Sequence, residues 1–562
     1  MDNNIKIIPF GGVRENGKNM YAVEIEDQIF ILDTGLKYPE NELMGIDVVI
    51  PDWEYLREHK DKIVGVFLTH GHADSIGALP YFLMDFNVPV FGSEMTIALA
   101  KLAVKNHKEV KKFNDFHVVD ASTAIDFNDV TVSFFQTTHT IPETLGVVLE
   151  TKAGNIVYTG DFKFDQTAKK GYQTDLARLA EIGSQGVLAL LSDSAGAGIT
   201  GASAREQDIG DYIKETFKYQ NGRIIVASVA SNIMRVQQII NAAVAVGRKI
   251  VLSGKDIEQI IDTAMSLGKL HLPDDLFISR KEAEKLEPNQ VVILETGKMG
   301  EPIKSLQQIA NGDNPNLQLT STDLVFVTTT PSYAQETEVQ KTKDMIYRTG
   351  AEVKFISDDL NPSGHANQND EQLMLNFMKP KFFIPIQGEY RLLDRHAELA
   401  EEVGIPKENI FLVNKGDVLT YKNGKFHVGE HIDVSNTMID GKKKKIVARP
   451  QITSRGFVFV KTNRQLMQQS ADLVEKIVQE NLDQKEFDWS HLKQDVRDKL
   501  NRFLFDQTKR HPVILPVIME INQHQKKIKN NVEKKEEKSA KSRSTKEHHR
   551  GRGKKRMAKE KK

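Results

Sequence analysis

The segment Leu68–Ser75 carries the residue types best suited to chemistry, because His70, His72 and Asp74 lie within five residues. An apolar run, Ile63–Leu68, leads directly into it and predicts a strand, whose end is a rigid platform for side chains. The glycine between the two histidines lets the loop turn sharply, so both imidazoles can converge. Imidazole and carboxylate are ligand types that zinc prefers. The segment therefore predicts a metal site.

Two more ligand types follow predicted strands. His139 follows the run Val132–Gln136, and Asp161 follows the run Ile156–Thr159 across a glycine. The chain has no cysteine, so a metal must be held by histidine and carboxylate. Ligand types at three successive strand ends favour one convergent metal site over polar residues that only cap the strands.

Three further positions are candidates for orienting or binding roles. Asp33 is expected to accept a hydrogen bond that orients the His70–Asp74 loop, although a plain turn aspartate fits the same sequence. Ser231 and Asn232 open a predicted helix whose free N–H groups favour an anion, and Asn is also an ordinary N-cap residue. A loop with backbone amides beside a glycine suits a phosphate. Its residues are Asn361, Pro362, Ser363, Gly364 and His365. The alternative for His365 is a surface histidine at a turn.

The elements that must position these residues change in type along the chain. Residues 1–204 are strand-rich, with short runs bounded by turns. The expected strands are Ile5–Pro9, Tyr21–Ile25, Ile29–Leu32, Val64–Thr69, Val130–Gln136, Leu145–Glu150 and Asn155–Thr159, with a helix at Glu94–Asn106. In residues 205–359, strand-like runs alternate with amphipathic helical runs, which predicts a parallel sheet covered by helices. The successive pairs are Arg223–Ser228 with Ile233–Val246, Lys249–Ser253 with Ile257–Ser266, and Asp323–Thr328 with Glu336–Arg348.

The last part of the chain predicts a return to strands and then a separate small domain. Residues 360–435 contain the expected strand Lys381–Ile386, the helix Tyr390–Val403 and short strands within Lys407–Val434. The polar, basic stretch 436–450 predicts a linker. Residues 451–525 predict a small α/β domain with strands Gly456–Lys461 and Val513–Ile521 and helices Arg464–Glu480 and Trp489–Lys509. Residues 526–562 predict a disordered tail.

Charge separates this tail from the body of the chain. The tail has 17 Lys and Arg against 5 Asp and Glu, and the remaining residues have 59 against 72. A basic tail suggests an anionic partner such as RNA, and a solvated tail without a specific partner is the alternative. Met1–Phe10 has no basic segment followed by an apolar stretch, and no apolar run is long enough to span a bilayer. We therefore expect a cytoplasmic protein with no membrane contact.

The motifs together resemble a known family. The segment His70–Ser75, with Asp33, His139 and Asp161, resembles the metallo-β-lactamase motif set, and the insertion at 205–359 resembles the β-CASP insertion of nucleic-acid nucleases. Several stretches resemble bacterial ribonuclease J: Gly17–Met20, Tyr158–Asp165, Ala230–Ile233, Ser363–His365 and Ile384–Arg391. The resemblance implies an α/β fold. It consists of a metallo-β-lactamase αββα sandwich, an inserted β-CASP α/β domain and a small C-terminal α/β domain.

The resemblance also implies two metal ions that act on a phosphodiester bond. His70, His72 and His139 match the ligands of the first metal, and Asp161 matches the aspartate that bridges both metals. Asp74 matches a ligand of the second metal and is an expected catalytic residue. His365 is expected to protonate the leaving oxygen, and its loop to contact the substrate phosphate. Ser231 and Asn232 match the segment near the RNA 5′ phosphate.

Two ligands of the second metal are replaced in this chain. The loop histidine is Ser75 and the late histidine is Gln387, and neutral hydroxyl and amide oxygens are poor zinc ligands beside imidazole. We therefore expect about one tightly bound zinc. Gln387 also stands where RNA-cleaving β-CASP enzymes usually have histidine, and Met234 where active paralogues are expected to have one. The pattern resembles the second, less active paralogue of the family.

Two functions remain open from the sequence. The first is a metal-dependent ribonuclease, 5′-to-3′ exonucleolytic with possible endonucleolytic cutting, in mRNA decay and rRNA maturation. The second is a nearly inactive subunit that partners an active ribonuclease J in a hetero-oligomer, with a homodimer as the other assembly. Another hydrolase on this fold, such as a thioesterase or lactamase, is disfavoured by the long insertion and the phosphate-type loops.

Overall fold

The computed structural model describes residues 4–38, 48–254, 256–296, 302–329, 336–358, 360–439, 464–482, 489–508 and 514. The chain forms two compact units. The first comprises Met1–Asn41 and Val48–Ile439, and the second comprises Glu42–Asp47 and Asp440–Lys562. All the predicted site residues lie in the first unit. None of the helices within the described ranges is long and apolar enough to cross a membrane.

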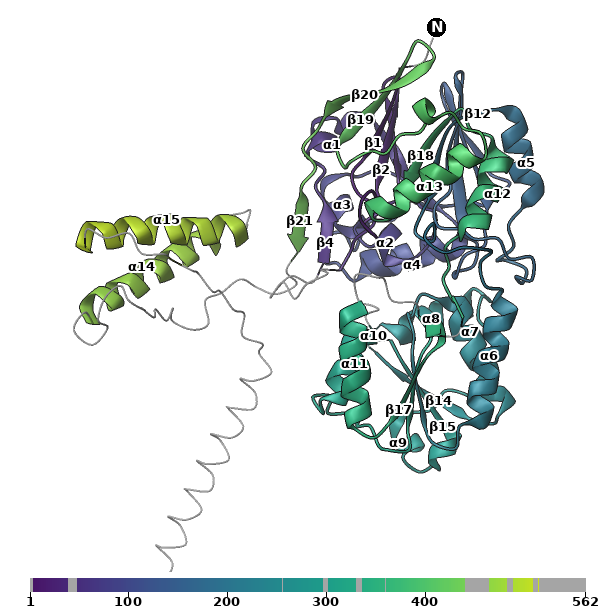
Figure 1. Cartoon of the computed structure of the whole chain (residues 1–562), viewed down its shortest axis with the longest axis vertical. Coiled ribbons are helices and arrows are strands. Elements are labelled where there is room, and N and C mark those ends of the chain that lie inside the picture. Colours follow the sequence, from purple (N-terminus) through teal and green to yellow (C-terminus); the bar gives the residue numbers. More distant parts are fainter. Residues whose placement is uncertain are drawn as a thin grey trace, which may run out of the picture. The chain divides into compact units, whose positions relative to one another are not determined.

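Two mixed sheets form the centre of the first unit (Figure 1). The eight-stranded sheet has the order β20-β19-β1-β2-β3-β5-β6-β7. Its strands are β1 (Ile5–Pro9), β2 (Tyr21–Ile25), β3 (Gln28–Leu32), β5 (Ile63–Phe67), β6 (Val90–Gly92), β7 (Phe116–Val118), β19 (Asp417–Lys422) and β20 (Lys425–His431). The six-stranded sheet has the order β18-β12-β11-β10-β9-β8. Its strands are β8 (Ala124–Phe127), β9 (Val130–Gln136), β10 (Leu145–Thr151), β11 (Gly154–Tyr158), β12 (Val187–Asp193) and β18 (Phe382–Ile386).

The two sheets pack face to face because each turns one apolar face inward. Tyr21 of the first sheet and Tyr158 of the second lie with ring centroids 5.3 Å apart, and alternate residues of both sheets share one buried cluster. Helices cover the outer faces. The first sheet carries α1 (Glu54–Glu58), α2 (Ala73–Ile76), α3 (Leu79–Asp85) and α4 (Glu94–Lys105), and the second carries α5 (Leu176–Gln185), α12 (Gln368–Met378) and α13 (Tyr390–Glu402). The predicted αββα sandwich is confirmed.

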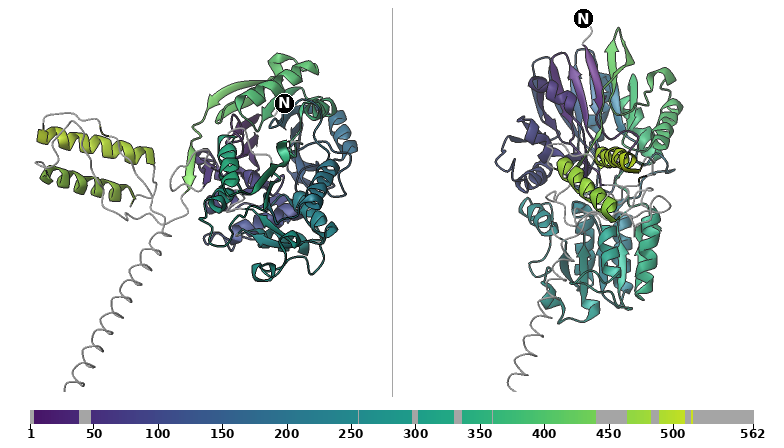
Figure 2. Two further views of the ribbon diagram at one scale, coloured as in Figure 1. Left: turned by 60° about the horizontal axis from the view of Figure 1, so that its bottom comes forward. Right: turned by 90° about the vertical axis from the view of Figure 1, so that its left-hand side faces the viewer.

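The predicted second α/β region is also present, as a five-stranded sheet with the order β14-β15-β13-β16-β17. All its neighbouring strands are parallel, as the alternation of strands and helices indicated. The strands are β13 (Ile224–Ala227), β14 (Lys249–Ser253), β15 (Val291–Glu295), β16 (Leu324–Val327) and β17 (Glu352–Phe355). The helices, on both faces of the sheet (Figure 2), are α6 (Glu206–Tyr219), α7 (Ile233–Ala245), α8 (Ile257–Ser266), α9 (Arg280–Ala283), α10 (Pro302–Ala310) and α11 (Glu336–Arg348). Single-turn 3-10 helices occur at Lys60–Lys62, Pro288–Gln290, Ile356–Asp358 and Lys407–Asn409.

The predicted linker begins too early. Asn436–Ile439 forms strand β21, which pairs antiparallel with β4 (Val48–Pro51), so the expectation of a linker is wrong for these four residues. The local sequence does not reveal this strand, because its partner lies near the other end of the first unit in sequence. In this pair, Thr437 lies opposite Ile50. Residues 440–450 of the predicted linker lie outside the described residues.

The second unit is described only through two helices, α14 (Arg464–Leu482) and α15 (Trp489–Thr508). They agree with the two helices predicted there, and they pack through Ile477, Leu492 and Val496. The predicted strands Gly456–Lys461 and Val513–Ile521 lie outside the described residues, apart from residue 514. The predicted basic tail, 526–562, also lies outside them.

A buried histidine in α13 makes the stability of the first unit dependent on pH. The Nδ1 atom of His396 lies 2.9 Å from the Ser194 hydroxyl, and its Nε2 atom has no hydrogen-bond partner among the described residues. Burial lowers the pKa of His396 from 6.5 to about 3. As the pH falls below 6.5, this histidine becomes protonated in the unfolded chain but stays neutral in the folded chain. The free energy of unfolding therefore falls by about 2 kcal/mol between pH 7 and pH 5.

Between pH 7 and pH 5, we expect the free energy of unfolding of the His396→Leu variant to fall by about 2 kcal/mol less than that of the parent chain. Urea-unfolding midpoints at pH 7 and pH 5 measure the difference between the variant and the parent chain. His427, which is exposed on β20, provides the matched control as His427→Leu. An equal acid-induced loss in the parent and in His396→Leu would contradict this assignment.

Candidate metal centre

Strand ends from both sheets meet at one edge of the sandwich. In the six-stranded sheet, β9, β11, β12 and β18 run in the same direction. The polar residues at or just after their carboxyl ends are His139, Asp161, Asp193 and Gln387. In the other sheet, β5 leads into the His70–Asp74 loop. The fold thus brings residues from distant parts of the sequence to one place.

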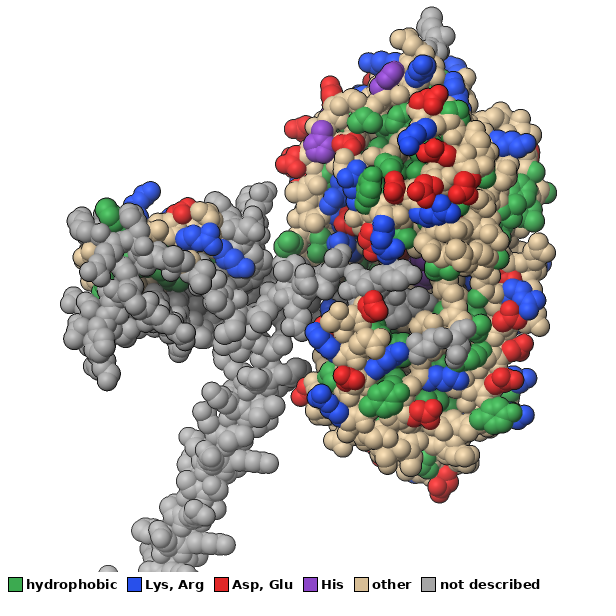
Figure 3. Space-filling model, viewed as in Figure 1, with side chains coloured by type: hydrophobic (Ala, Val, Ile, Leu, Met, Phe, Trp, Pro, Cys, Tyr) green, Lys and Arg blue, Asp and Glu red, His purple; other side chains and the backbone are tan. Residues whose placement is uncertain are grey.

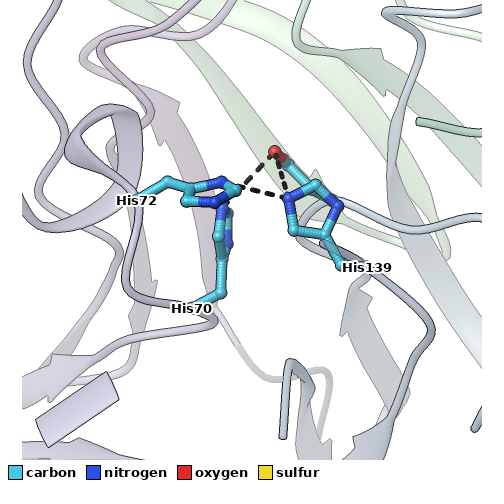
Figure 4. A group of neighbouring side chains, drawn as sticks. His70, His72 and His139 are labelled. Atoms are coloured by element: carbon cyan, nitrogen blue, oxygen red, sulfur yellow. Dashed lines mark hydrogen bonds and ion pairs between the residues drawn. The ribbon is translucent and has the colours of Figure 1, made fainter. Parts of the chain in front are cut away.

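Four of the predicted ligands converge at this edge, namely His70, His72, His139 and Asp161. Figure 4 labels the three histidines, whose rings point toward one another. The Nε2 atom of His139 lies 3.1 Å from Nδ1 of His72 and 3.8 Å from Oδ2 of Asp161. The Nε2 atom of His70 lies 3.5 Å from the same Asp161 oxygen. All four ligand atoms lie within 4.8 Å of one another.

These spacings fit one tetrahedral metal ion. Two nitrogen ligands at ordinary zinc distances and the tetrahedral angle lie about 3.3 Å apart, close to the separations observed here. Two of the buried atoms, His70 Nε2 and Asp161 Oδ1, have no hydrogen-bond partner among the described residues. Buried polar atoms normally have a partner, and a metal ion would supply one for His70.

The three imidazoles are held in the form that binds metal. Burial lowers the pKa of His70 and of His139 well below its ordinary value, and lowers that of His72 to about 4. The rings are therefore neutral at pH 7, which is the form a metal ligand requires. A hydrogen bond of 2.9 Å joins Nδ1 of His139 to the carbonyl oxygen of Gly364, so the Nε2 lone pair remains for a metal.

Asp33 lies behind the histidine loop and is completely buried. Its carboxylate accepts hydrogen bonds from the Thr69 amide at 2.8 Å, the Thr69 hydroxyl at 2.8 Å and the Tyr158 hydroxyl at 2.7 Å. The Thr69 hydroxyl also lies 3.0 Å from Nδ1 of His70. Asp33 thus connects the loop that carries His70 to the opposite sheet, as the orienting role requires.

Comparison with known proteins identifies the family of the chain. The family model of the metallo-beta-lactamase superfamily matches residues 13–181, and that of the ribonuclease J beta-CASP domain matches residues 221–346. The models of the Zn-dependent metallo-hydrolase RNA specificity domain and the ribonuclease J C-terminal domain match residues 352–412 and 431–521. The chain is 50% identical over 549 residues to ribonuclease J 2 of Streptococcus pyogenes serotype M3, across 92% of this chain and 99% of that protein. The chain belongs to the ribonuclease J family.

Another relative and a solved structure support this membership and the fold. Ribonuclease J2 of Bacillus subtilis is 40% identical over 549 residues, across 92% of this chain and 99% of that protein. A crystal structure described as a protein of unknown function from Enterococcus faecalis V583 has a TM-score of 0.52 at 13% identity, and covers 74% of this chain and 100% of that one. At this low identity, the second likeness shows the fold alone. The family predicted from the motifs is confirmed, and the chain is a metallo-hydrolase of the ribonuclease J family.

The resemblance to the ribonuclease J motifs predicts a second metal position beside Asp74. Asp74 Oδ1 lies 3.9 Å from His70 Nε2. Ser75 and Gln387 are buried, and their side-chain oxygen and nitrogen atoms have no hydrogen-bond partner among the described residues. Gln387 directly follows Ile386, which pairs with Asp193 at the end of β12. Neutral oxygens at these two positions fit zinc poorly.

His365 has a partner that the sequence did not reveal. Its Nδ1 atom lies 2.7 Å from Oδ2 of Asp193 and 3.9 Å from Oδ2 of Asp161. Burial alone would lower the pKa of His365, but Asp193, Asp161 and Asp74 outweigh it and raise this pKa to about 10. These carboxylates therefore favour the protonated form of the imidazole. The sequence feature that could have identified Asp193 is the largely apolar run Val187–Asp193, which forms a strand and ends in this carboxylate.

The predicted phosphate loop lies directly against the histidines. Gly364 has no room for a side chain, because a Cβ atom there would lie 2.6 Å from Cε1 of His139. In α7, the Asn232 side chain accepts a hydrogen bond from the Arg235 amide, so it acts as the N-cap. The ring of His72 donates a hydrogen bond to the backbone carbonyl of Ser231, which places the start of α7 beside the metal ligands. Asn361, Pro362 and Ser363 complete this loop, and the Ser363 hydroxyl accepts from the His365 amide at 3.1 Å.

Proposed function

We propose that this chain is a metal-dependent ribonuclease of low activity when alone, with 5′-to-3′ exonuclease and possible endonuclease activity in mRNA decay and rRNA maturation. The observation that carries the proposal is the convergence of His70, His72, His139 and Asp161 next to His365, whose Nδ1 atom lies 2.7 Å from Asp193. The family models for a ribonuclease J β-CASP domain and an RNA specificity domain support RNA as the substrate.

The proposal gives the chain's own residues the following roles. A bound metal would supply Lewis acidity at the scissile phosphate. Asp193 holds Nδ1 of His365, so that Nε2 presents a proton to the leaving oxygen. The backbone amides around Gly364 and the start of α7 suit the flanking phosphates. Asp33 keeps the His70 ring in its ligating orientation through Thr69.

The second candidate is a nearly inactive subunit that assembles with an active ribonuclease J paralogue. The buried, unpartnered side chains of Ser75 and Gln387 favour it, because they leave the second metal position without imidazole. Phosphodiesterase activity of the purified chain on a 5′-monophosphorylated RNA, with and without the paralogue, separates the two candidates. Cleavage by the chain alone that is lost in His365→Ala supports the enzyme, and activity seen only with the paralogue supports the subunit.

We expect about one zinc ion to remain bound per chain after dialysis, since one tetrahedral ligand set is complete. Elemental analysis measures it. His139→Ala should lose the ion, and Gln387→Ala should keep it, because the amide is not among the converging ligands. Two tightly held ions in the parent chain would contradict the incomplete second position. If no ion remained bound, the four converging residues would not form a working metal site.

We expect removal of residues 526–562 to weaken RNA binding and to flatten its dependence on salt. On the visible face of the first unit, basic and acidic side chains are interspersed (Figure 3), whereas the tail has 17 Lys and Arg. The slope of log K against log salt should fall by about 0.7 for each phosphate that the tail no longer neutralises. A full-length variant with these Lys and Arg replaced by Gln controls for chain length. An unchanged slope in both variants would exclude the tail as an RNA contact.

A further inference from the structure

Three fully or nearly buried charges join the metallo-β-lactamase sheets to the β-CASP sheet. Lys163 follows β11 in the first part, Glu206 begins α6 where the chain first crosses to the β-CASP sheet, and Arg235 lies in the first turn of α7. Their side chains are 0%, 7% and 1% exposed. None of these residues is a ligand or a substrate contact in the proposed function.

The contacts of Glu206 connect both domains through one carboxylate. Lys163 Nζ donates to Oε1 of Glu206 at 2.6 Å and to the carbonyl oxygen of Ala204 at 3.1 Å. On the other side, Arg235 Nη2 lies 3.8 Å from Oε2 of Glu206. The Gln238 amide also donates to this oxygen, at 2.9 Å. Burial alone would raise the pKa of Glu206, but Arg235 and Lys163 lower it below its ordinary value, so the group is a carboxylate.

Arg235 extends this connection to the second crossing between the domains, which is the loop with His365. Its Nη2 atom donates to the carbonyl oxygen of Pro362 at 3.3 Å, and its Nη1 atom donates to Gln238 at 2.8 Å. The two crossings are also joined to each other, because the Ser203 hydroxyl donates to the carbonyl oxygen of His365 at 3.2 Å. The Asn367 amide donates to that same hydroxyl at 3.1 Å.

We propose that Lys163, Glu206 and Arg235 form a latch between the domains that positions the His365 loop, with Arg235 as the positioning residue that acts through Pro362. The proposal rests on the proposed function for the role of His365. The Arg235 guanidinium belongs to α7, so these contacts position the His365 loop relative to the helix whose first residues are expected to bind a phosphate. Because all three charges are buried, removal of one leaves the others without a full partner in a medium of low dielectric constant.

The variants for the test are Arg235→Met, Arg235→Lys and Glu206→Gln. Arg235→Lys keeps a cation near Glu206, but one ammonium group cannot reproduce the two directed contacts to Gln238 and Pro362. Arg235→Lys therefore tests the same contacts if the Arg235→Met variant does not fold. The matched control is Lys269→Ala. Lys269 also joins the two domains by ion pairs with Glu143 and with Glu94, but it lies nearer the surface.

The first measurement is hydrogen–deuterium exchange of the metal-loaded chain. We expect residues 361–366 to exchange about tenfold faster in the Arg235 and Glu206 variants, with β11 and β12 unchanged. Lys269→Ala should match the parent. Unchanged exchange in 361–366 overturns the proposal, and an equal rise throughout β11 and β12 overturns it as well, because the cluster would then be merely structural.

The second measurement is cleavage of a 5′-monophosphorylated RNA. A displaced His365 should lower kcat by about 10-fold or more while KM stays within about twofold. An unchanged kcat in variants with fast loop exchange overturns the positioning role. If the parent chain does not cleave RNA at all, the enzymatic proposal fails, and the exchange measurement alone then decides whether the latch holds the loop.

Discussion

Ser75→His together with Gln387→His should add a second bound metal and raise ribonuclease activity about 10-fold or more above the parent chain. The oxygen ligands are already present, since Asp161 lies in the existing cluster and Asp74 lies 3.9 Å from His70. Only two imidazoles are missing from the expected set. Both native side chains are buried and unpartnered, so neither substitution removes a hydrogen bond within the described residues.

The two substitutions should be strongly non-additive. One added imidazole leaves the second ion under-coordinated, so each single variant should change the rate less than about twofold. A larger side chain in a packed interior also costs stability unless it binds an ion. Ser75→Leu with Gln387→Leu is the control for bulk, because it has similar volume and no ligand atom. This control should gain neither metal nor rate.

Metal content and cleavage are measured on the same preparations. A second metal without a faster rate would locate the defect in substrate positioning. No second metal would show that Ser75 and Gln387 do not lie at a metal position, and would contradict the motif comparison that placed them there.

The sequence was sufficient for the residues whose role depends on local order. His70 and His72 are two residues apart after a strand, and His139 and Asp161 each follow a strand, so these strand ends were sufficient to predict a shared site. The parallel sheet at 205–359 was predictable for the same reason, because alternating strands and helices leave few arrangements.

Residues whose role depends on distant pairing were not predictable. Asp193 becomes a partner of His365 only because β12 pairs with β11 on one side and β18 on the other, and the run Val187–Asp193 is too uniformly apolar to be assigned by periodicity. Asn436–Ile439 was predicted as linker because its pairing with β4 is formed across most of the chain. Charged side chains usually lie at the surface, so the sequence did not predict that Lys163 and Glu206 are buried. Their burial is explained by the contact between the domains.

The largest expected loss of stability concerns Asp33. Its substitution by alanine leaves three buried donors without an acceptor, namely the Thr69 amide, the Thr69 hydroxyl and the Tyr158 hydroxyl. Each unsatisfied donor costs about 1–3 kcal/mol, so we expect the three to lower the free energy of unfolding by about 3–9 kcal/mol, measured by urea unfolding. Burial raises the pKa of Asp33 to about 7 against the opposing effect of these hydrogen bonds. Burial of this carboxyl group lowers the stability of the fold, and the three hydrogen bonds that it accepts offset that loss.

Asp33→Ala should also weaken metal binding 10- to 100-fold, because Thr69 would no longer be held beside His70. Asp33→Asn is the matched control. It keeps one acceptor oxygen and tolerates the backbone φ of 58° at this position, which alanine adopts only with strain. We expect its loss of metal affinity to be smaller than that of Asp33→Ala. Tyr158→Phe removes one donor and leaves the Thr69 contacts in place, so it should reduce stability without a comparable loss of metal. If Asp33→Ala bound zinc within twofold of the parent chain, Asp33 would be a turn residue whose contribution ends at the fold.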